Sequence, residues 1–350
     1  MKKANLIRDY LLKNPPKQNG DYDRIARLLD TTADNIRYHS RMLGLNLRAR
    51  EETEMKTIKV KQSDIYQVVP ESWETKLGQN KIYSVDLSKF YGKKLRFGVI
   101  SDTHLGSRHQ QITFLHEAYR VFDKEEVEFV VCAGDITEGN GSHYPGQIQE
   151  LFLFTFDDQL RYAVEALPRL KSGKPTYFIT GDHDLDWFKA GGRDIGEAIG
   201  ELRSDWVYCG QVGAYLTVGS RNRKFIYLHH PRGGTAYAKS YKAQKWIEAV
   251  APENKPQIYI TGHFHSNSLY LFTRNVHHIA PGCLQSQTPF LAAQGTEVIL
   301  SFVVVDISLD TRGGVTSLLP RYFYEFMPKR NDYPHFQFQK VIPPNETKIG

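Results

Sequence analysis

Five apolar segments of this chain each run directly into a short polar segment that contains Asp or His. Apolar runs of this length, alternating with helical stretches, are typical of strands in a layered α/β fold. Side chains at the carboxyl ends of such strands gather in one crevice of the sheet. The segments are Leu95–Ile100 before Asp102 and His104, Phe129–Ala133 before Asp135, Thr176–Thr180 before Asp182, Phe225–Leu228 before His229 and His230, and Ile258–Thr261 before His263 and His265. One such segment is a weak signal, whereas five in order predict a single metal-binding site.

The order of these motifs resembles the calcineurin-like metallophosphoesterase family, and the resemblance covers residues 94–307. It implies an α/β fold, a four-layer αββα sandwich, with two metal ions that share a bridging carboxylate and a bridging hydroxide. The implied ligands are Asp102, His104 and His265 for one metal, Asp135 as the bridge, and Asp182, His229 and His263 for the other. His230 is the alternative to His229, because both histidines follow the same strand.

The resemblance also implies roles for two further residues. His183 faces the substrate, as general acid for the leaving oxygen or as a transition-state donor, and Glu138 orients it. Position 182 departs from the family, which usually has Asn there. The extra negative charge of Asp182 should tighten the second metal but weaken it as a Lewis acid. Imidazole and carboxylate ligands suit manganese, which we expect first, or iron, zinc or nickel.

The positive charge of the chain is concentrated at its beginning. Residues 1–50 hold 11 Lys/Arg and 5 Asp/Glu, so they carry the whole net charge of +6. Helical spacing in residues 2–13, around Ile25 and from Ala33 to about Leu43 resembles the helix-turn-helix family. This resemblance implies a DNA-binding module whose third helix offers Asn35, Arg37, Tyr38 and Arg41 to the nucleic acid.

These patterns divide the chain into four parts. We expect a helix-turn-helix domain over 1–47, a linker with weak strands over 48–93, the phosphoesterase domain over 94–327 and an extended tail over 328–350. Within the phosphoesterase domain, helices are expected near 111–125, 147–170, 194–203 and 241–250.

Further motifs point to nucleic acid as the substrate. Gly139, Tyr144–Gln147 and Glu150–Leu151 are similar to a loop in the exonuclease small subunit of archaeal family-D DNA polymerase. The loop around Arg232, Lys239 and Lys242 resembles that of phage and bacterial proteins joining a helix-turn-helix to this phosphoesterase, and its cations could hold phosphates. We therefore expect a dimetal phosphodiesterase acting as a nuclease, specifically a 3′–5′ exonuclease on DNA.

Two other functions stay open on the sequence. The chain could be a small-molecule phosphodiesterase or phosphatase, or a DNA-binding regulator with an inactive phosphoesterase scaffold. The three cysteines suit a reducing cytosol, which favours the cytoplasm of a bacterial or phage-infected cell. No apolar stretch reaches the ~18 residues of a membrane helix, so we expect no membrane partner. A homo-oligomer stays an open alternative.

Overall fold

The computed structural model describes residues 3–17, 20–43, 81–85, 87–218, 223–234 and 236–333. The chain divides into two units, Met1–Leu77 and Gly78–Gly350. Each unit has its own hydrophobic core. Among the described residues, no helix combines the length and the apolarity that crossing a membrane requires.

The first unit contains three short helices, as the sequence predicts. They are α1 (Lys3–Lys13), α2 (Gly20–Leu28) and α3 (Ala33–Met42). Helix α3 begins after Thr32, whose side-chain oxygen accepts a hydrogen bond from the backbone N–H of Asn35 at 3.2 Å. The buried residues that join the three helices are Ile7, Leu11, Tyr22, Ile25, Ala26 and Ile36.

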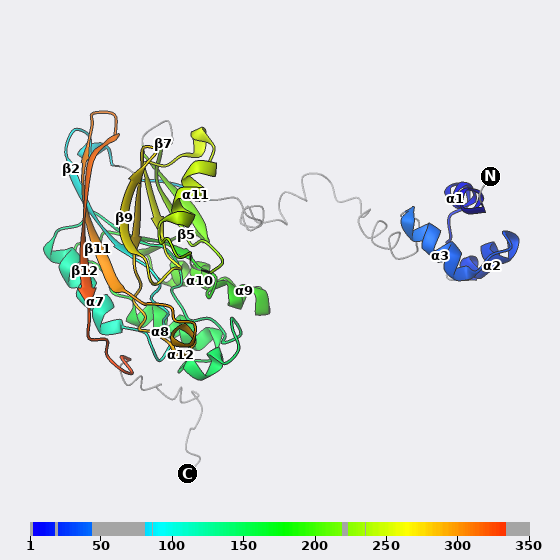
Figure 1. Ribbon diagram of the computed structural model, residues 1–350, viewed down its shortest axis with the longest axis horizontal. Coiled ribbons are helices and arrows are strands. Elements are labelled where there is room, and N and C mark those ends of the chain that lie inside the picture. The colour runs from blue at the N-terminus through cyan, green and yellow to red at the C-terminus, as the bar shows by residue number, and fades with distance from the viewer. Residues whose placement is uncertain are drawn as a thin grey trace, which may run out of the picture. The chain divides into compact units, whose positions relative to one another are not determined.

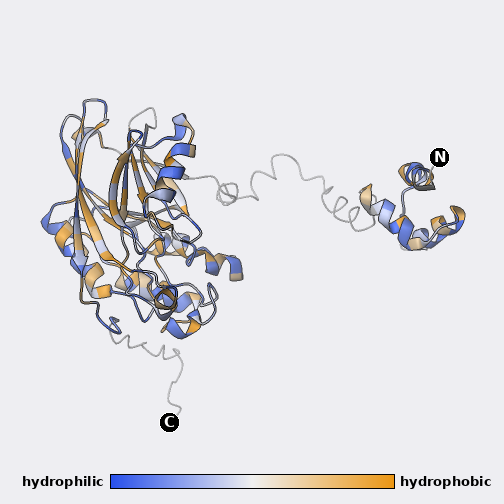
Figure 2. Cartoon of the chain, in the orientation of Figure 1, coloured by the Kyte–Doolittle hydropathy of each residue, from blue (hydrophilic) through white to orange (hydrophobic). Residues whose placement is uncertain are grey.

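The second unit contains two six-stranded sheets (Figure 1). In sheet order, one consists of β12 (Val315–Glu325), β11 (Leu300–Leu309), β2 (Lys94–Ile100), β3 (Val130–Cys132), β4 (Thr176–Thr180) and β5 (Trp206–Gln211). The other consists of β1 (Lys81–Ser84), β6 (Gly213–Val218), β7 (Arg223–His229), β8 (Ile258–Thr261), β10 (Val276–Pro281) and β9 (Ser268–Thr273). The strands are predominantly apolar (Figure 2), which is typical of sheets covered on both faces.

Alternation along the strands builds the layers. Val131 of β3 belongs to the core between the two sheets, whereas Val130 and Cys132 belong to the core beneath a layer of helices. That layer consists of α7 (Ile112–Lys124), α8 (Phe156–Ala166), α9 (Leu185–Gly191) and α10 (Ile195–Leu202). Helix α11 (Tyr241–Ala249) packs through Ile247 on the outer face of the second sheet. The predicted αββα sandwich is therefore confirmed.

Short elements complete the second unit. They are the 3-10 helices η1 (Ser88–Phe90), η2 (Gln147–Glu150) and η3 (Pro252–Asn254), and the one-turn helix α12 (Pro289–Ala293). The helix expected over 147–170 is divided in the structure, because Leu151 forms a bridge with Ser107 and α8 begins only after its cap, Thr155.

Two expected boundaries differ from the structure. Strand β1 lies inside the segment expected to be a linker, and it pairs in parallel with β6 at the edge of the second sheet. Residues 48–80 and 86 of that segment lie outside the described residues. At the other end, Lys329 and Asp332 bind the start of α7. The Asp332 carboxylate accepts hydrogen bonds from the backbone and hydroxyl of Thr113, so it caps that helix. Residues 334–350 lie outside the described range.

Strands β2, β3 and β4 run parallel to one another, and so do β7 and β8. Their carboxyl ends therefore meet at one edge of each sheet. This arrangement positions the candidate site.

Candidate metal centre

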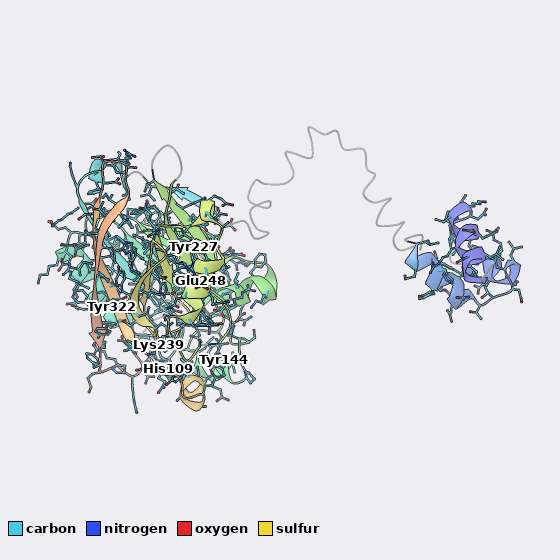
Figure 3. The ribbon with its side chains drawn as sticks, turned by 45° about the horizontal axis from the view of Figure 1, so that its top comes forward. His109, Tyr144, Tyr227, Lys239, Glu248 and Tyr322 are labelled. Atoms are coloured by element: carbon cyan, nitrogen blue, oxygen red, sulfur yellow. The ribbon has the colours of Figure 1, made fainter. Side chains whose placement is uncertain are left out.

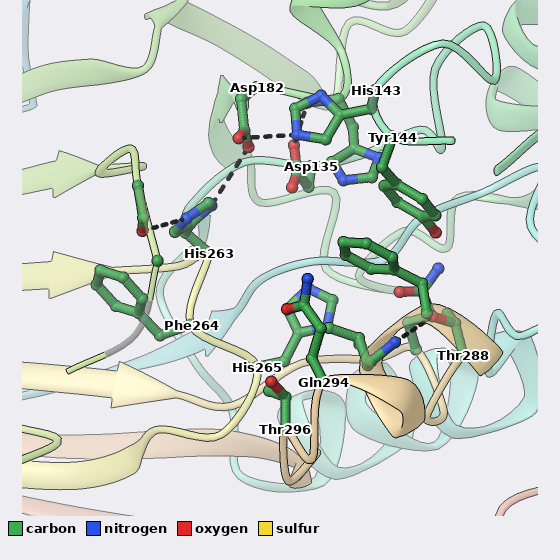
Figure 4. Close-up of a pocket in the computed structure, with 16 residues that line it drawn as sticks. Asp135, His143, Tyr144, Asp182, His263, Phe264, His265, Thr288, Gln294 and Thr296 are labelled. Atoms are coloured by element: carbon green, nitrogen blue, oxygen red, sulfur yellow. Dashed lines mark hydrogen bonds and ion pairs between the residues drawn. The ribbon is translucent and has the colours of Figure 1, made fainter. Parts of the chain in front are cut away.

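Seven Asp and His side chains from both sheets gather at these strand ends. Figure 4 labels Asp135, Asp182, His263 and His265 among them. They form two groups, each with ligand atoms close enough together to hold one metal ion. The first group consists of Asp102, His104 and His265, and the second of Asp135, Asp182, His230 and His263.

The first group follows β2 and β8. The Nε2 atoms of His104 and His265 lie 3.0 Å apart, and Nε2 of His265 lies 3.4 Å from Oδ1 of Asp102. Asp102 also accepts hydrogen bonds from the backbone N–H of His263, at 2.9 and 3.1 Å. This carboxylate therefore ties the end of β2 to the end of β8.

The second group follows β3, β4, β7 and β8. Nε2 of His230 lies 3.1 Å from Oδ2 of Asp135 and 2.9 Å from Oδ1 of Asp182. Nδ1 of His263 lies 3.3 Å from the same Asp182 oxygen. Oδ2 of Asp135 also faces Nε2 of His104 at 3.7 Å. The Asp135 carboxylate thus lies between the two groups, which is the position of a bridging ligand.

Hydrogen bonds at the outer ring nitrogens test whether these histidines fit a metal. Nδ1 of His104 pairs with the Glu138 carboxylate at 3.0 Å, and Nδ1 of His230 donates to the Ala133 carbonyl at 2.8 Å. Nε2 of His263 donates to the Gly233 carbonyl at 3.0 Å. Each outer nitrogen then carries a hydrogen, so the inner nitrogen is the one that faces the carboxylates and that can turn a lone pair toward a cation once it is unprotonated. Ring nitrogens gathered with carboxylates in this way fit bound cations. A hydrogen bond at the outer ring nitrogen is also usual for histidines that bind metals.

The backbone is unusual at the same place. Asp102, His104, Asp135 and His263 have positive φ angles of 54°, 46°, 50° and 75°. Residues other than glycine rarely adopt this region, and such strain is concentrated at functional sites. Close packing also requires Gly134, because a Cβ at that position would lie 2.5 Å from Nδ1 of His230.

The histidines lower the pKa values of the buried carboxyl groups. Burial alone would raise the pKa of Glu138, but the charge and hydrogen bond of His104 outweigh it and lower this pKa to about 2. Hydrogen bonds from His143, His230 and His263 likewise outweigh burial and lower the pKa of Asp182. Both groups are therefore carboxylates.

The structure places His230, the alternative to the expected His229, in the second ligand group, and it places His229 outside both groups. Tyr227 and His229 lie on the same face of β7, because side chains two residues apart in a strand point the same way. That face lies toward α11, where Nδ1 of His229 is 2.7 Å from the hydroxyl of Tyr259 (Tyr227 is labelled in Figure 3). Burial lowers the pKa of His229 to about 3. His230 points the opposite way, into the second ligand group.

Glu138 contacts His183 as expected, with its Oε1 atom 3.5 Å from Nδ1 of His183. The Glu138 carboxylate is directed mainly at His104, and its backbone carbonyl accepts the hydrogen bond from Nδ1 of His183 at 3.0 Å. Nε2 is then the nitrogen of His183 that is available to a substrate. Burial lowers the pKa of His183, although the charges of Asp135 and Glu138 oppose the shift.

Several residues that support the site carry no motif of their own. Gln285 donates to the Glu138 carboxylate at 2.6 Å, and Asp184 accepts hydrogen bonds from the backbones of Ile136, Thr137 and Gly181. Sequence reasoning missed both. Nothing in the sequence around Gln285 indicates that it lies at the site. Asp184 belongs to the motif that follows β4, but it lies in neither ligand group.

His143 is the most informative of these supporting residues, and its position in the loop after Asp135 was its only signal. Its Nε2 lies 3.4 Å from Oδ2 of Asp182, and its Nδ1 lies 3.1 Å from Oδ2 of Asp186. Hydrogen bonds to Asp182 and then Asp186 raise the pKa of His143 to about 10. Asp182 carries a negative charge that the family's usual Asn lacks. The positively charged His143 ring beside it compensates this charge.

The expected phosphate-binding cations are partly engaged elsewhere. Nζ of Lys239, labelled in Figure 3, lies 2.6 Å from the Glu297 carboxylate, whereas Arg232 is exposed. Lys242 donates to the Gly233 carbonyl at 2.9 Å, the same carbonyl that binds His263. This loop thus supports a ligand as well as presenting positive charge.

On α3, the residues expected to contact nucleic acid differ in their exposure. Arg37 and Tyr38 are exposed, and Arg37 pairs with Asp34 at 2.8 Å. The Asn35 amide donates to the hydroxyl of Thr31 at 2.9 Å. The side chain of Arg41 lies outside the described part of the structure.

A cavity of about 360 Å³ opens beside the two ligand groups. It is lined by His183, by several of the candidate ligands and by the rings of Tyr144 and Phe290 (Figure 4 labels Asp135, Asp182, His263 and Tyr144). A four-layer sandwich with this site is that of a metal-dependent phosphoesterase. The family model of the calcineurin-like phosphoesterase matches residues 95–301, and the chain belongs to this family.

Similarity to solved structures is distant. Vacuolar Protein Sorting 29 from Cryptosporidium parvum is 15% identical, and the match covers 66% of this chain and 99% of that chain with a TM-score of 0.36. For the 5′-nucleotidase precursor from Thermus thermophilus the identity is 11%, the coverage 66% and 54%, and the TM-score 0.34. A search of the curated proteins finds no match. The family match does not reach residues 1–47, so the helix-turn-helix function stays a prediction. The resemblance of residues 139–151 to the polymerase subunit also stays a prediction, because the family model is matched by phosphoesterases in general.

Proposed function

We propose that this phosphoesterase is a phosphodiesterase that cleaves nucleic acid with two divalent metal ions, as a 3′–5′ exonuclease on DNA. The observation that carries the proposal is the position of the Asp135 carboxylate between two groups of inward-facing ring nitrogens. Asp102, His104 and His265 would hold one ion, and Asp182, His230 and His263 the other. Bound there, the two ions would supply an activated water and neutralise charge on the phosphate.

The role of His183 follows from its hydrogen bonds. The Glu138 carbonyl fixes Nδ1, so Nε2 is the nitrogen that can act on the substrate. A phosphodiester anion beside the ring favours its protonated form, which can then donate to the leaving oxygen. For a 3′–5′ exonuclease the leaving oxygen is the 3′-oxygen of the preceding nucleotide.

The first unit supports nucleic acid as the substrate. Residues 1–50 carry the entire positive excess of the chain, and cationic side chains bind phosphates of any sequence. Exposed Arg37 and Tyr38 on α3 are of the types that contact nucleic acid. Manganese is the metal we propose, because imidazole and carboxylate ligands suit it. The chain has only three cysteines, all buried, which favours the cytoplasm as its location.

A substrate panel tests the function. With Mn²⁺ present, we expect hydrolysis of single-stranded or duplex DNA in preference to RNA, a cyclic dinucleotide and bis-p-nitrophenyl phosphate. Shortening of 3′-labelled and 5′-labelled strands distinguishes the direction of digestion. Asp135→Asn is the inactive control, because it weakens both proposed metal sites. Hydrolysis of the cyclic dinucleotide or of bis-p-nitrophenyl phosphate without any cleavage of DNA would overturn the proposal.

A small phosphodiester is the second candidate, and the size of the cavity favours it. A volume of about 360 Å³ is at the lower end of ordinary small-molecule pockets. The same panel separates the two candidates.

A further inference from the structure

Two stacked aromatic rings form the wall of the cavity that faces the metal centre. The rings of Tyr144 and Phe290 lie parallel, with their centroids 3.9 Å apart and an interplanar angle of 12°. Both line the same cavity as Asp182, His183 and His263 (Figure 4 labels Tyr144). The two rings, here called the aromatic shelf, come from segments far apart in the sequence.

The aromatic shelf is held in place by a buried carboxylate. The Tyr144 hydroxyl donates to Oε2 of Glu150 at 2.5 Å, and the Phe290 backbone N–H donates to Oε1 of the same residue at 3.4 Å. Glu150 is only 7% exposed, so this link is shielded from solvent. Phe290 is the second residue of the one-turn helix α12, which Thr288 caps by accepting the N–H of Leu291 at 3.2 Å. Because both rings are already held in place, little side-chain conformational entropy is lost when a second flat group binds to them.

Polar groups occur beside the aromatic shelf. Gln285, Thr288, Gln294 and Thr296 line the same cavity. Side-chain amides and hydroxyls next to a flat apolar surface provide donors and acceptors for the edge of a heterocyclic ring. A nucleobase combines such an edge with a flat face, and every base can stack on an aromatic side chain.

We propose that the aromatic shelf of Tyr144 and Phe290 is a nucleobase-binding subsite that holds a base next to the scissile phosphate. This inference rests on the proposed function, because it names the part of the substrate that lies beside the metal centre. The shelf lies on the side of His183, with 6.3 Å between the ring centroids of Tyr144 and His183. The stacked base therefore belongs to a nucleotide at the reacting phosphodiester.

A base stacked on protein cannot also be stacked and paired within a duplex. The subsite therefore selects unpaired nucleotides, such as single strands or frayed ends. Methyl and other simple alkyl phosphodiesters have no flat group that could stack on the aromatic shelf.

The test compares substrates that differ only in their bases. A short oligothymidylate is compared with one whose last two sugars are abasic, using full-length protein and Mn²⁺. Phe290→Leu keeps the apolar volume but removes the flat ring, whereas Phe290→Trp keeps a ring. Phe272→Leu is the matched control, because Phe272 is 55% exposed on β9 and does not line this cavity.

We expect Phe290→Leu to raise KM for the oligothymidylate about tenfold, with kcat and the KM for the abasic substrate unchanged. Phe290→Trp and Phe272→Leu should keep the wild-type preference for bases. An equal rise in KM for both substrates, or no rise for either, would overturn the subsite.

Failure of the proposed function gives a different result. If no oligonucleotide is cleaved, thymidine 5′-p-nitrophenyl phosphate is compared with methyl p-nitrophenyl phosphate. The two share a leaving group and differ in the nucleoside. If the wild type has a lower KM for the thymidine ester than for the methyl ester, and Phe290→Leu removes this difference, the subsite is supported in a small-molecule enzyme. Equal KM values in the wild type would overturn the subsite as well.

Discussion

His230 and His229 are adjacent in the chain but serve different surroundings. Nε2 of His230 lies between the carboxylates of Asp135 and Asp182, whereas His229 is packed among aromatic rings beneath α11. His230→Ala should therefore reduce the metal content from two ions per chain to one, while His229→Phe keeps both. Elemental analysis after equilibration with Mn²⁺ measures this. Loss of metal from His229→Phe alone would show that the ligand assignment is wrong.

Asp182 is the second residue whose role can be tested. Its carboxylate both faces His230 and His263 and stabilises the His143 imidazolium. Asp182→Asn should loosen one metal and lower the pKa of His143 from about 10, because a charge that favours protonation is removed. Titration calorimetry with Mn²⁺ and NMR titration of His143 measure the two effects.

Asp186→Asn is the matched control for this prediction. Asp186 contacts His143 but not the two ligand groups, so its replacement should lower the pKa of His143 and leave metal affinity unchanged. Equal metal affinities for wild type and Asp182→Asn would contradict a ligand role for Asp182.

At the scale of single residues, the sequence predicts ligand types better than ligand orientation. Asp102, Asp135 and Asp182 each follow one strand, so their positions are fixed by the strand ends. Two consecutive histidines after β7 give no such guidance, since this strand is apolar on both faces and periodicity cannot identify the inner one.

Strand β10 carries a buried neutral histidine, and this gives a prediction at the scale of the element. Nε2 of His278 lies 2.9 Å from the Thr261 hydroxyl on neighbouring β8. Burial lowers the pKa of His278 to about 3 from 6.5. The unfolded chain therefore takes up a proton below pH 6.5 that the folded chain refuses, so the free energy of unfolding falls as the pH drops from 6.5 toward 3.

At about pH 5 this single group should cost about 2 kcal/mol relative to pH 7, where its contribution is nearly complete. His278→Gln keeps a donor for Thr261 but does not titrate, so its stability should depend on pH less steeply by that amount. Urea unfolding at the two pH values measures the difference. Parallel pH profiles for wild type and variant would contradict this prediction.

The sequence predicts long elements well and short ones poorly. Each strand between 95 and 261 is bounded by glycine or polar residues, and the structure places it within a few residues of its expected range. Helices α9 and α12 were not expected, because helices this short depend on tertiary contacts more than on local sequence. Strand β1 falls in the segment where weak strands were expected, but its range was not predicted, because its partner β6 lies more than a hundred residues further along the chain.

At the scale of the whole molecule, the order of the five motifs resembles the calcineurin-like metallophosphoesterase family, and this resemblance was enough to predict the sandwich. The same reasoning could not reach the aromatic shelf. Tyr144 and Phe290 come from loops that meet only in the folded chain, and neither lies in a motif that requires a partner.

The positive charge is distributed unevenly along the chain, and this leads to a prediction about the whole chain. Residues 51–350 carry no net charge, whereas residues 1–50 carry +6. If DNA is the substrate, its affinity for the protein should come mainly from the first unit. Binding should then weaken steeply with salt, by a slope near 0.9 per duplex phosphate contacted or 0.7 per single-strand phosphate.

Removing residues 1–50 should flatten this salt dependence and raise KM for DNA. It should leave the hydrolysis of bis-p-nitrophenyl phosphate nearly unchanged, because the first ligand is Asp102. Arg37→Glu in full-length protein should act in the same direction, whereas Lys94→Glu, an exposed position on β2, serves as a control of equal charge change. Fluorescence anisotropy with labelled DNA at two salt concentrations measures binding, and both hydrolysis rates are measured alongside. Identical DNA binding by full-length and truncated protein would exclude a nucleic-acid role for the first unit and favour a small phosphodiester as the substrate.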